Sequence, residues 1–406
     1  MSTDFDIIVV GAGPAGSSCA LHAERLGMKV LLLDKQKFPR DKTCGDALSS
    51  ASLREIEGLG LMQSLMENPS VKVNKITYTC SNGQSVTVPL PKIDPSLPTT
   101  GMVCRRVVFD SMLLDAARER VEVMDWCAMR QVLTEDGRAC GVNAEMGGKR
   151  EFSFTAKAVV GADGAMSQVA RQTGFPKYPQ YRSVAARAYY RLVTGTVGSL
   201  EIYFLNEILP GYLWLYPTES GMTNVGLSIP LEGVKRKKLC PREALNQALR
   251  LPLLSDRFEL SKRMGRIDVA MLPVGNTMRR IHGPGVALVG DAAGVVNPCS
   301  SEGIFGALLS GRLAAETLAK ACQDRTSPDE TLMKTYPERL WRELGPTLRL
   351  SDRLLELRSP KAIDSLIRSA KRRPHNAGWI SGILIGSALP SDELSSFLGY
   401  LDFFRR

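Results

Sequence analysis

Apolar residues occur in uninterrupted runs at three widely separated places, and each run ends at a glycine. The runs cover 7–10, 158–160 and 286–289. Short continuous apolar runs that stop at turn residues are typical of strands in a parallel sheet with both faces covered. We therefore predict an α/β core to which distant parts of the chain each contribute a strand.

Other segments alternate or repeat with the period of a helix. Residues 71–90 alternate and contain Ser-Asn-Gly at 81–83, which is a β-hairpin signal. Residues 103–120 carry an apolar stripe at helical spacing. We further predict helices over 52–66 and 301–320, a meander of strands over 176–271, and amphipathic helices from about 326 onward, broken by prolines 360, 374 and 390.

The first apolar run leads into a glycine triplet. Gly11, Gly13 and Gly16 follow the strand and precede a predicted helix, and Asp34 ends the next apolar run eighteen residues later. Glycines in this position allow a tight turn and close backbone approach, while the helix N-terminus favours a pyrophosphate and the acid a ribose. This context predicts a dinucleotide site.

The two later runs indicate which dinucleotide. One leads into Asp163-Gly164 and the other into Gly290-Asp291, the latter followed by small residues and a helix. A carboxylate just past a strand suits a sugar-like chain, and the helix N-terminus favours negative charge on a cofactor. A nicotinamide enzyme needs no such series of sites, whereas FAD does. The other reading of both aspartates is ordinary turn chemistry.

These motifs resemble a known superfamily. GAGPAG at 11–16, GADGAMSQVAR at 161–171 and GDAAGVVNPCSSEG at 290–303 are similar to the p-hydroxybenzoate hydroxylase superfamily of flavoproteins. FPRDKTCGD at 38–46 and PGYLWLYP at 210–217 resemble the geranylgeranyl reductase family, which hydrogenates isolated double bonds of polyprenyl chains. The resemblance covers about residues 1–325.

The resemblance implies FAD as cofactor, with a site spread over the motifs. The predicted cofactor-binding residues are Gly11, Gly13, Ala15, Gly16, Asp34, Lys35, Arg40, Cys44, Gly45, Arg106, Asp163, Gly164, Gly290, Asp291, Pro298, Gly303 and Ile304.

The predicted fold class is α/β (α+β overall), with a Rossmann-like FAD-binding lobe, an antiparallel-sheet substrate lobe and a helical C-terminal region. The discontinuous FAD-binding domain is expected to comprise 1–75, 101–175 and 272–325. The substrate-binding sheet domain comprises 76–100 and 176–271, and the helical region 326–406. A chain of 406 residues exceeds one ordinary core, which agrees with two lobes.

The segment 211–217 carries aromatic rings at every second position. In a strand Tyr212, Trp214 and Tyr216 project on one face, where rigid rings suit a flat flavin and an apolar chain. Packing within a half-buried sheet is the other reading. The resemblance implies that Tyr212, Trp214 and Gly226 line the cavity where substrate meets flavin. The predicted substrate-binding residues are therefore Tyr212, Trp214, Tyr216 and Gly226.

An isolated alkene needs a proton as well as a hydride, in a site that excludes water. Cys44 lies in a basic loop that can tune a thiol, and Tyr212 is the other candidate acid; with Trp214 they form the predicted catalytic set. A small buried hydrophobe is the alternative for Cys44. Glu302 is expected to orient the flavin loop rather than to donate a proton.

Three positions depart from the family's pattern. Ala47 stands where a glycine is usual after Cys-Gly-Asp, Ser300-Ser301 replaces a Thr-Gly pair, and Ser228 replaces a glycine after the aromatic strand. Each adds atoms near the expected substrate cavity, so the length and headgroup of the substrate stay open.

The net charge of +10 is clustered at 235–238, 279–280, 371–373 and 405–406. No nucleic-acid motif accompanies it, so no nucleic-acid partner is expected. An apolar stretch at 379–389 is too short to span a bilayer, but with the basic residues it could contact an anionic membrane surface peripherally. The alternative is a buried helix packed on the flavin lobe.

Nine cysteines without a CxxC pair and three histidines predict reduced thiols and no metal site. The first strand begins too early for a signal peptide, so we expect a cytoplasmic protein, or one peripheral on the inner membrane face.

Three functions compete at this stage. The first is an FAD-dependent reductase acting on a polyprenyl lipid or quinone. The second is a monooxygenase, either a hydroxylase or a halogenase. The halogenase is the weaker match, because Tyr-x-Trp-x-Tyr-Pro at 212–217 departs at two positions from the halogenase motif Trp-x-Trp-x-Ile-Pro. The third is a lipid- or flavin-binding module without turnover. The electron donor stays open between NADPH, for which no second complete GxGxxG exists, and a reduced carrier such as ferredoxin.

Overall fold

The computed structural model describes residues 3–90, 101–176, 182–196, 198–322 and 328–372. Its first sheet has the order β17-β18-β11-β1-β2-β8, and β10 pairs with both β11 and β9. The central strand β1 runs parallel to β2 and β11, and β18 continues the parallel set. The strands are β1 (Phe5–Val10), β2 (Val30–Leu33), β8 (Glu122–Met124), β9 (Cys127–Glu135), β10 (Arg138–Met146), β11 (Arg150–Gly161), β17 (His282–Gly283) and β18 (Val286–Leu288).

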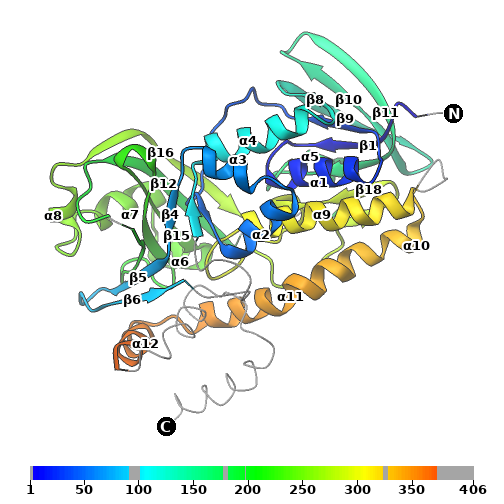
Figure 1. The fold of residues 1–406 in the computed structure, drawn as a ribbon. Helices are drawn as coiled ribbons and strands as arrows, with labels where there is room; N and C mark the ends of the chain where they lie inside the picture. Colours follow the sequence, from blue (N-terminus) through cyan, green and yellow to red (C-terminus); the bar gives the residue numbers. More distant parts are fainter. Residues whose placement is uncertain (1–2, 91–100, 177–181, 197, 323–327, 373–406) are drawn as a thin grey trace.

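Helices from opposite ends of the described chain pack together on this sheet. α1 (Pro14–Arg25) and α9 (Ile304–Ala321) lie side by side, with the long α11 (Thr335–Glu356) beside α9 (Figure 1). A Cβ on Gly311 would come within 2.3 Å of the Ala15 carbonyl oxygen, so this glycine permits the close approach. The α/β core built from distant segments is therefore confirmed.

A second sheet has the order β16-β12-β15-β14-β13-β5-β6 and is mostly antiparallel. The predicted hairpin at 71–90 supplies its far edge, where β5 pairs in parallel with β13. The strands are β5 (Lys75–Cys80), β6 (Ser85–Pro89), β12 (Ser183–Arg191), β13 (Leu200–Phe204), β14 (Tyr212–Pro217), β15 (Met222–Pro230) and β16 (Lys262–Leu272).

The prediction of strands throughout 176–271 is wrong for residues 231–258. Three helices occupy 231–258, namely α6 (Leu231–Lys237), α7 (Pro241–Ala248) and α8 (Ser255–Phe258). α7 buries Ala244, Leu245 and Ala248 against the face of the sheet that points away from the aromatic rings. The sheet is also not a simple meander, because β12 lies between β15 and β16.

The single helix predicted over 52–66 is divided. α2 (Ser50–Gly58) and α3 (Met62–Glu67) are separated by a turn in which Gly60 has φ +69°, outside the helical region. A small sheet of β3 (Ala47–Leu48), β7 (Gly101–Val103) and β4 (Val71–Val73) lies beside α4 (Arg106–Arg118) and α2, and α5 (Gln168–Gln172) follows β11.

The described C-terminal part is helical, as predicted. It contains α10 (Glu330–Met333), α11 and α12 (Pro360–Arg372), the last beginning at a predicted proline break. α12 packs Ile363, Leu366 and Ile367 against the second sheet near β5 and β6 (Figure 1). The stretch 379–389 lies outside the described residues. The division into three domains stays a prediction.

Within the part of the chain that the structure describes, none of the helices combines the length and apolar character needed to cross a membrane.

Candidate cofactor and active site

A cavity of about 1260 Å³ extends from the glycine turn after β1 to the aromatic strand β14. This exceeds the few hundred to about 1,000 Å³ of an ordinary small-molecule pocket. Both sheets line it, so a ligand inside would contact segments from most of the chain. The size suits a large cofactor together with a second ligand.

At one end the backbone itself forms the wall. Gly11 has φ +107°, and a Cβ there would lie 2.4 Å from the Ala162 carbonyl oxygen. Gly13 faces the cavity, whereas a Cβ on Gly16 would lie 1.8 Å from the Gly11 carbonyl oxygen. Gly16 thus serves helix–strand packing rather than lining the cavity. Gly11 and Gly13, the glycine cradle, line the cavity with backbone alone, which fits the close approach of a dinucleotide.

Asp34 stands at the end of β2, as its spacing predicts. Its Oδ2 accepts a hydrogen bond from the Ala12 amide and its Oδ1 one from the Gln36 amide, both at 2.8 Å. These bonds hold the carboxylate beside the glycine turn, in the wall of the cavity. The arrangement could present an acceptor to a ribose hydroxyl.

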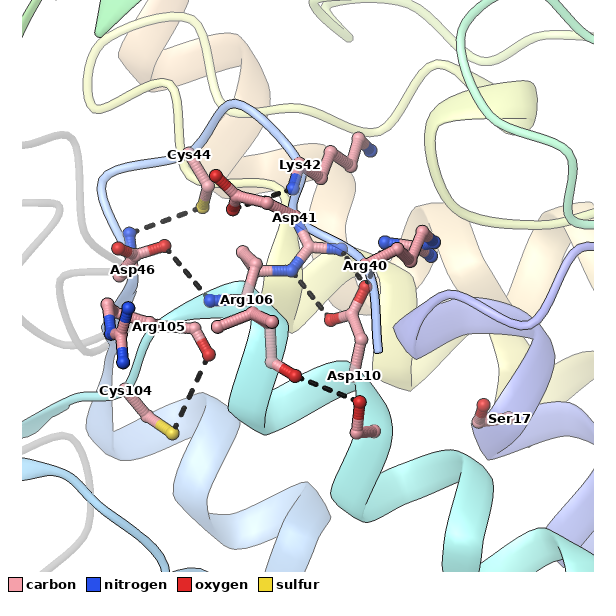
Figure 2. Close-up of polar contacts among 12 residues, drawn as sticks. Ser17, Arg40, Asp41, Lys42, Cys44, Asp46, Cys104, Arg105, Arg106 and Asp110 are labelled. Atoms are coloured by element: carbon pink, nitrogen blue, oxygen red, sulfur yellow. Dashed lines mark hydrogen bonds and ion pairs between the residues drawn. The ribbon is translucent and has the colours of Figure 1, made fainter. Parts of the chain in front are cut away.

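A buried group of three charges lies below the loop that carries Cys44 (Figure 2). Arg106 donates two hydrogen bonds of 2.7 Å to Asp110, and Arg40 donates a third of the same length. Burial would raise the pKa of Asp110, but the charge of Arg106, with that of Arg40, holds the pKa below its usual value. Two cations against one anion leave positive charge at the cavity wall, which suits phosphate or an electron-rich ring.

The third predicted acid, Asp291, also lines the cavity. It pairs with Lys42 at 2.8 Å, and the Lys42 charge lowers the Asp291 pKa although burial acts in the opposite direction. Gly290 does not line the cavity: a Cβ there would lie 2.7 Å from the Ala15 Cβ. Its role is to bring β18 close to α1.

Asp163 has a structural role in addition to its place in the cavity wall. Its carboxylate accepts hydrogen bonds from the Ser167 hydroxyl and from the Gln168 and Val169 amides at the start of α5. Among the described residues, the contacts of the Asp163 carboxylate are therefore those of an ordinary turn aspartate, the alternative given above for this residue.

The aromatic strand forms the wall at the other end. Tyr212, Trp214 and Tyr216 lie on one face with neighbouring ring centroids 6.0 and 6.2 Å apart. All three are buried and line the cavity, together with apolar side chains of β5 and β13. Leu213 and Leu215 point to the opposite face, beneath the helices of 231–258.

The prediction that Gly226 lines the cavity is wrong. A Cβ on Gly226 would lie 2.3 Å from Cζ2 of Trp214, so the indole ring lies over the glycine. Gly226 acts indirectly, by giving the ring space to lie against the sheet.

The basic loop does not lower the pKa of Cys44. Burial raises this pKa, and the charge of Arg106 opposes the increase only in part. The sulfur accepts a 3.3 Å hydrogen bond from the Asp46 amide. Cys44 therefore carries its proton at neutral pH, in the wall of the cavity.

Asp46 has a role in the site that the sequence motifs do not predict. It is fully buried, at φ +63°. Its carboxylate accepts hydrogen bonds from the Tyr189 hydroxyl (2.6 Å), the Asn224 amide group (2.7 Å) and the Arg106 backbone (3.3 Å; Figure 2 shows the last). Asn224 in turn accepts a bond from the Trp214 indole. Asp46 thus connects the Cys44 loop to the aromatic wall. No sequence pattern marks this role, because its partners lie 60, 143 and 178 residues away along the chain.

The loop 297–303 closes the site from the α9 side. The Tyr212 hydroxyl donates to the Ser300 carbonyl, and burial raises the pKa of Tyr212 to about 12. Glu302 accepts hydrogen bonds from Ser49 and Ser52, as expected for an orienting residue, while burial raises its pKa.

The cavity brings together most of the predicted cofactor set. Gly11, Gly13, Ala15, Asp34, Lys35, Arg40, Cys44, Gly45, Arg106, Asp163, Gly164, Asp291, Gly303 and Ile304 line it, whereas Gly16, Gly290 and Pro298 do not. Pro298 is buried within the loop whose following residues form the wall. Among the described residues, no group of three His, Cys, Asp or Glu side chains is placed to hold a metal ion.

An α/β fold with this glycine cradle, beside an apolar cavity lined by a second sheet, defines the class of flavin-dependent oxidoreductases. Residues 4–340 match the model of the FAD binding domain family, and FAD is the cofactor of this class.

Two relatives refine the class. The chain is 32% identical to digeranylgeranylglycerophospholipid reductase 2 of Methanopyrus kandleri over 85% of its length and 84% of the relative. It is 31% identical to menaquinone reductase of Mycolicibacterium smegmatis over 97% and 98% of the two chains. The chain belongs to the geranylgeranyl reductase family of FAD-dependent oxidoreductases.

Solved structures show the same fold. A geranylgeranyl bacteriochlorophyll reductase-like protein of Thermoplasma acidophilum gives a TM-score of 0.81 at 22% identity, covering 98% of this chain and 99% of the other. A flavin-dependent brominase gives 0.78 at 20% identity, covering 99% of both. The fold therefore serves more than one chemistry, and the sequence relatives favour the reductases.

Proposed function

We propose that the protein hydrogenates isolated C=C bonds in the prenyl chain of a lipid or quinone. The observation that carries this proposal is the continuity of the glycine cradle with an apolar, aromatic-walled cavity. An apolar chain could enter that cavity and still reach the cofactor end. The two relatives, a digeranylgeranylglycerophospholipid reductase and a menaquinone reductase, support the same substrate class.

The residues present fit FAD. The glycine cradle with Asp34 would hold the adenosine part, and the positive group of Arg40, Arg106 and Asp110 would face a phosphate or the flavin. Asp291 and the loop 297–303 would hold the remaining sugar-like chain and ring. When bound and reduced, FAD supplies the hydride.

The chain's own task is to supply a proton and to exclude water. The Cys44 thiol is the better-supported donor, because burial keeps it protonated and it lies in the cavity wall. The Tyr212 proton is already donated to the Ser300 carbonyl. The buried rings of β14 keep water away from the reacting carbon.

An anaerobic single turnover tests this function. The holoprotein is reduced with dithionite under argon and mixed with geranylgeranylated glycerolipids and menaquinones, and product masses are read with and without air. A gain of two hydrogens per step without oxygen is expected. A product that gains an oxygen atom, and forms only in air, would instead assign the protein to the hydroxylases; reduction without any substrate conversion would leave only a binding role.

The Cys44→Ala variant identifies the proton donor. We expect it to retain FAD and to lose at least about 100-fold in turnover, the usual contribution of a general acid. Unchanged turnover would mean that Cys44 is not the proton donor. The Tyr212→Phe variant would then test Tyr212 for that role.

The donor of electrons and the cellular site are further parts of the proposal. NADPH or a reduced carrier such as ferredoxin would deliver electrons, and the protein would work in the cytoplasm, peripherally on the inner membrane face. Exposed Lys235, Arg236 and Lys238, and Lys371 with Arg372 at the end of α12, are the basic residues that would contact anionic lipid. Sedimentation with phosphatidylglycerol vesicles, compared with neutral vesicles, measures that contact.

A further inference from the structure

Two serines that replace glycines of the family's pattern touch each other at the edge of the cavity, which Ser301 lines and Ser228 does not. Ser228 lies on β15, and Ser301 lies in the loop before α9. Their hydroxyl oxygens are 2.8 Å apart. The pair, named here the serine bridge, joins the second sheet to the loop 297–303.

The serine bridge continues into the aromatic wall. Tyr212 pairs with Ser228 in neighbouring strands, and its hydroxyl donates to the Ser300 carbonyl. The Ser301 side chain also hydrogen-bonds to Tyr212. The Ser301 hydroxyl thus lies between the Ser228 hydroxyl and the Tyr212 ring and contacts both.

Backbone strain at Ser301 shows that the bridge is a costly arrangement. Ser301 has φ +56°, a conformation in which a glycine is unstrained and a serine is not. Ser228 is 3% exposed, so its hydroxyl would lose a buried hydrogen-bond partner without Ser301. The two residues depend on each other.

We propose that the serine bridge determines specificity: it closes the space between β15 and the loop 297–303, so that a slender prenyl chain is accepted along the aromatic wall and a flat ring is not. The proposal rests on the proposed function. Atoms 2.8 Å apart leave no passage between sheet and loop. A ligand beside Tyr212 must then extend toward the apolar side chains of Ile202 and Phe204.

Ligand binding to the oxidised holoprotein tests the closure without turnover. Changes in flavin absorbance are followed during titration with geranylgeraniol, a chain without a ring, and with menadione, a ring without a chain. Wild type is expected to prefer the chain. In the Ser228→Gly/Ser301→Gly variant we expect this preference to fall by about tenfold, the usual effect of reshaping an apolar pocket by a few atoms. An unchanged ratio of the two dissociation constants would overturn the proposal.

A stability comparison tests the bridge itself. Ser220 is exposed and has φ +60°, so Ser220→Gly is a matched control that relieves the same strain. We expect Ser220→Gly to raise Tm by about 1 °C and Ser301→Gly to lower it by about 2 °C, because only the latter loses the bridge. Equal shifts in the two variants would contradict a bonded bridge.

The two proposals fail in distinguishable ways. If wild type binds geranylgeraniol but does not hydrogenate it, the proposed function fails. The ratio of the two dissociation constants still tests the role of the serine bridge in that case. If hydrogenation occurs and the ratio does not change in the double variant, only the bridge proposal fails.

Discussion

At the scale of single residues, Asp46 connects several elements of the site. Three hydrogen-bond donors from three elements converge on its carboxylate, and the Trp214 indole reaches it through Asn224. Burial raises its pKa to about 6, although the charge of Arg187 and the Tyr189 and Asn224 bonds oppose the increase. Asp41 raises it further, and Cys44 and Cys104 face the same carboxylate.

The raised pKa has a predictable effect on stability. Between about pH 4 and pH 6 the folded state binds the Asp46 proton more tightly than the unfolded chain, so this group stabilises the protein as the pH falls through that window. Above pH 6 the contribution is constant. In Asp46→Asn it is absent, and we expect urea unfolding at pH 4.5 and pH 7.5 to show a larger wild-type advantage at the lower pH.

The same variant should be less stable than wild type at both pH values. The side-chain NH2 group of an asparagine would face the hydrogen-bond donors that now contact the Asp46 carboxylate. This lowers the free energy of unfolding by on the order of 1–3 kcal/mol. A variant as stable as wild type at pH 7.5 would contradict the role of Asp46 as the common acceptor.

Gly226 is the second residue with an individual role. A Cβ there would lie 2.3 Å from the Trp214 ring and 2.6 Å from the Ala186 carbonyl oxygen. Gly226→Ala should therefore displace the indole and destabilise the fold by about 1–3 kcal/mol. Trp fluorescence and urea unfolding measure the two effects. Gly58→Ala serves as the packing control, because Gly58 is exposed, has open space around it and does not have a positive φ.

At the scale of elements, β14 separates two functions on its two faces. Tyr212, Trp214 and Tyr216 face the cavity, while Leu213 and Leu215 form the core under α7. Strand alternation alone predicts the division, because successive side chains point to opposite faces. It does not predict which face meets the ligand; the packing of 231–258 on the other face decides that.

Trp214→Ala should remove part of the cavity wall without disturbing the glycine cradle. We expect the variant to retain FAD on gel filtration and to lose prenyl turnover by at least about tenfold. Leu215→Ala, on the opposite face, should lower stability by about 2–5 kcal/mol with a smaller effect on turnover per folded molecule. Equal turnover in wild type and Trp214→Ala would contradict the role of Trp214 in the wall of the substrate cavity.

At the scale of the whole molecule, the site is assembled from segments that are far apart in sequence. Lys42 and Asp291 form an ion pair in the cavity wall. α1 lies near the start of the segment that matches the FAD binding domain family, and it packs against α9, which lies near the end of that segment. A bound cofactor that touches both segments would link them. Stability should then rise with FAD concentration, since the ligand binds the folded state.

Asp291→Ala tests this linkage. The variant is expected to elute without flavin and to show a smaller rise of Tm on addition of FAD than wild type does. Asp256→Ala, at a surface position on α8, is the control and should behave like wild type. Retention of the yellow band by Asp291→Ala would contradict the placement of the cofactor.

Much of the cofactor end could be read from the sequence because its determinants are local. The glycine turn at 11–16 works through steric exclusion of side chains within one βα unit, and the spacing to Asp34 follows from one more strand. The sequence pattern predicts ligand contact for Gly16 and Gly290 as well, because it cannot separate a glycine that approaches a cofactor from one that approaches a helix. It does not predict the helices of 231–258, because they are short and packing on the sheet stabilises them.

The sequence by itself determined the class of fold, the FAD cradle and the alternation of the aromatic strand, since each depends on backbone sterics and on neighbours within a few residues. Only the tertiary structure decided that Asp46 is a shared acceptor, that Cys44 keeps its proton, and that Ser228 meets Ser301. Those properties depend on burial and on partners that are tens to hundreds of residues away. Hydrogen bonding and desolvation act at distances of a few ångströms in space, and spacing along the chain does not encode that proximity.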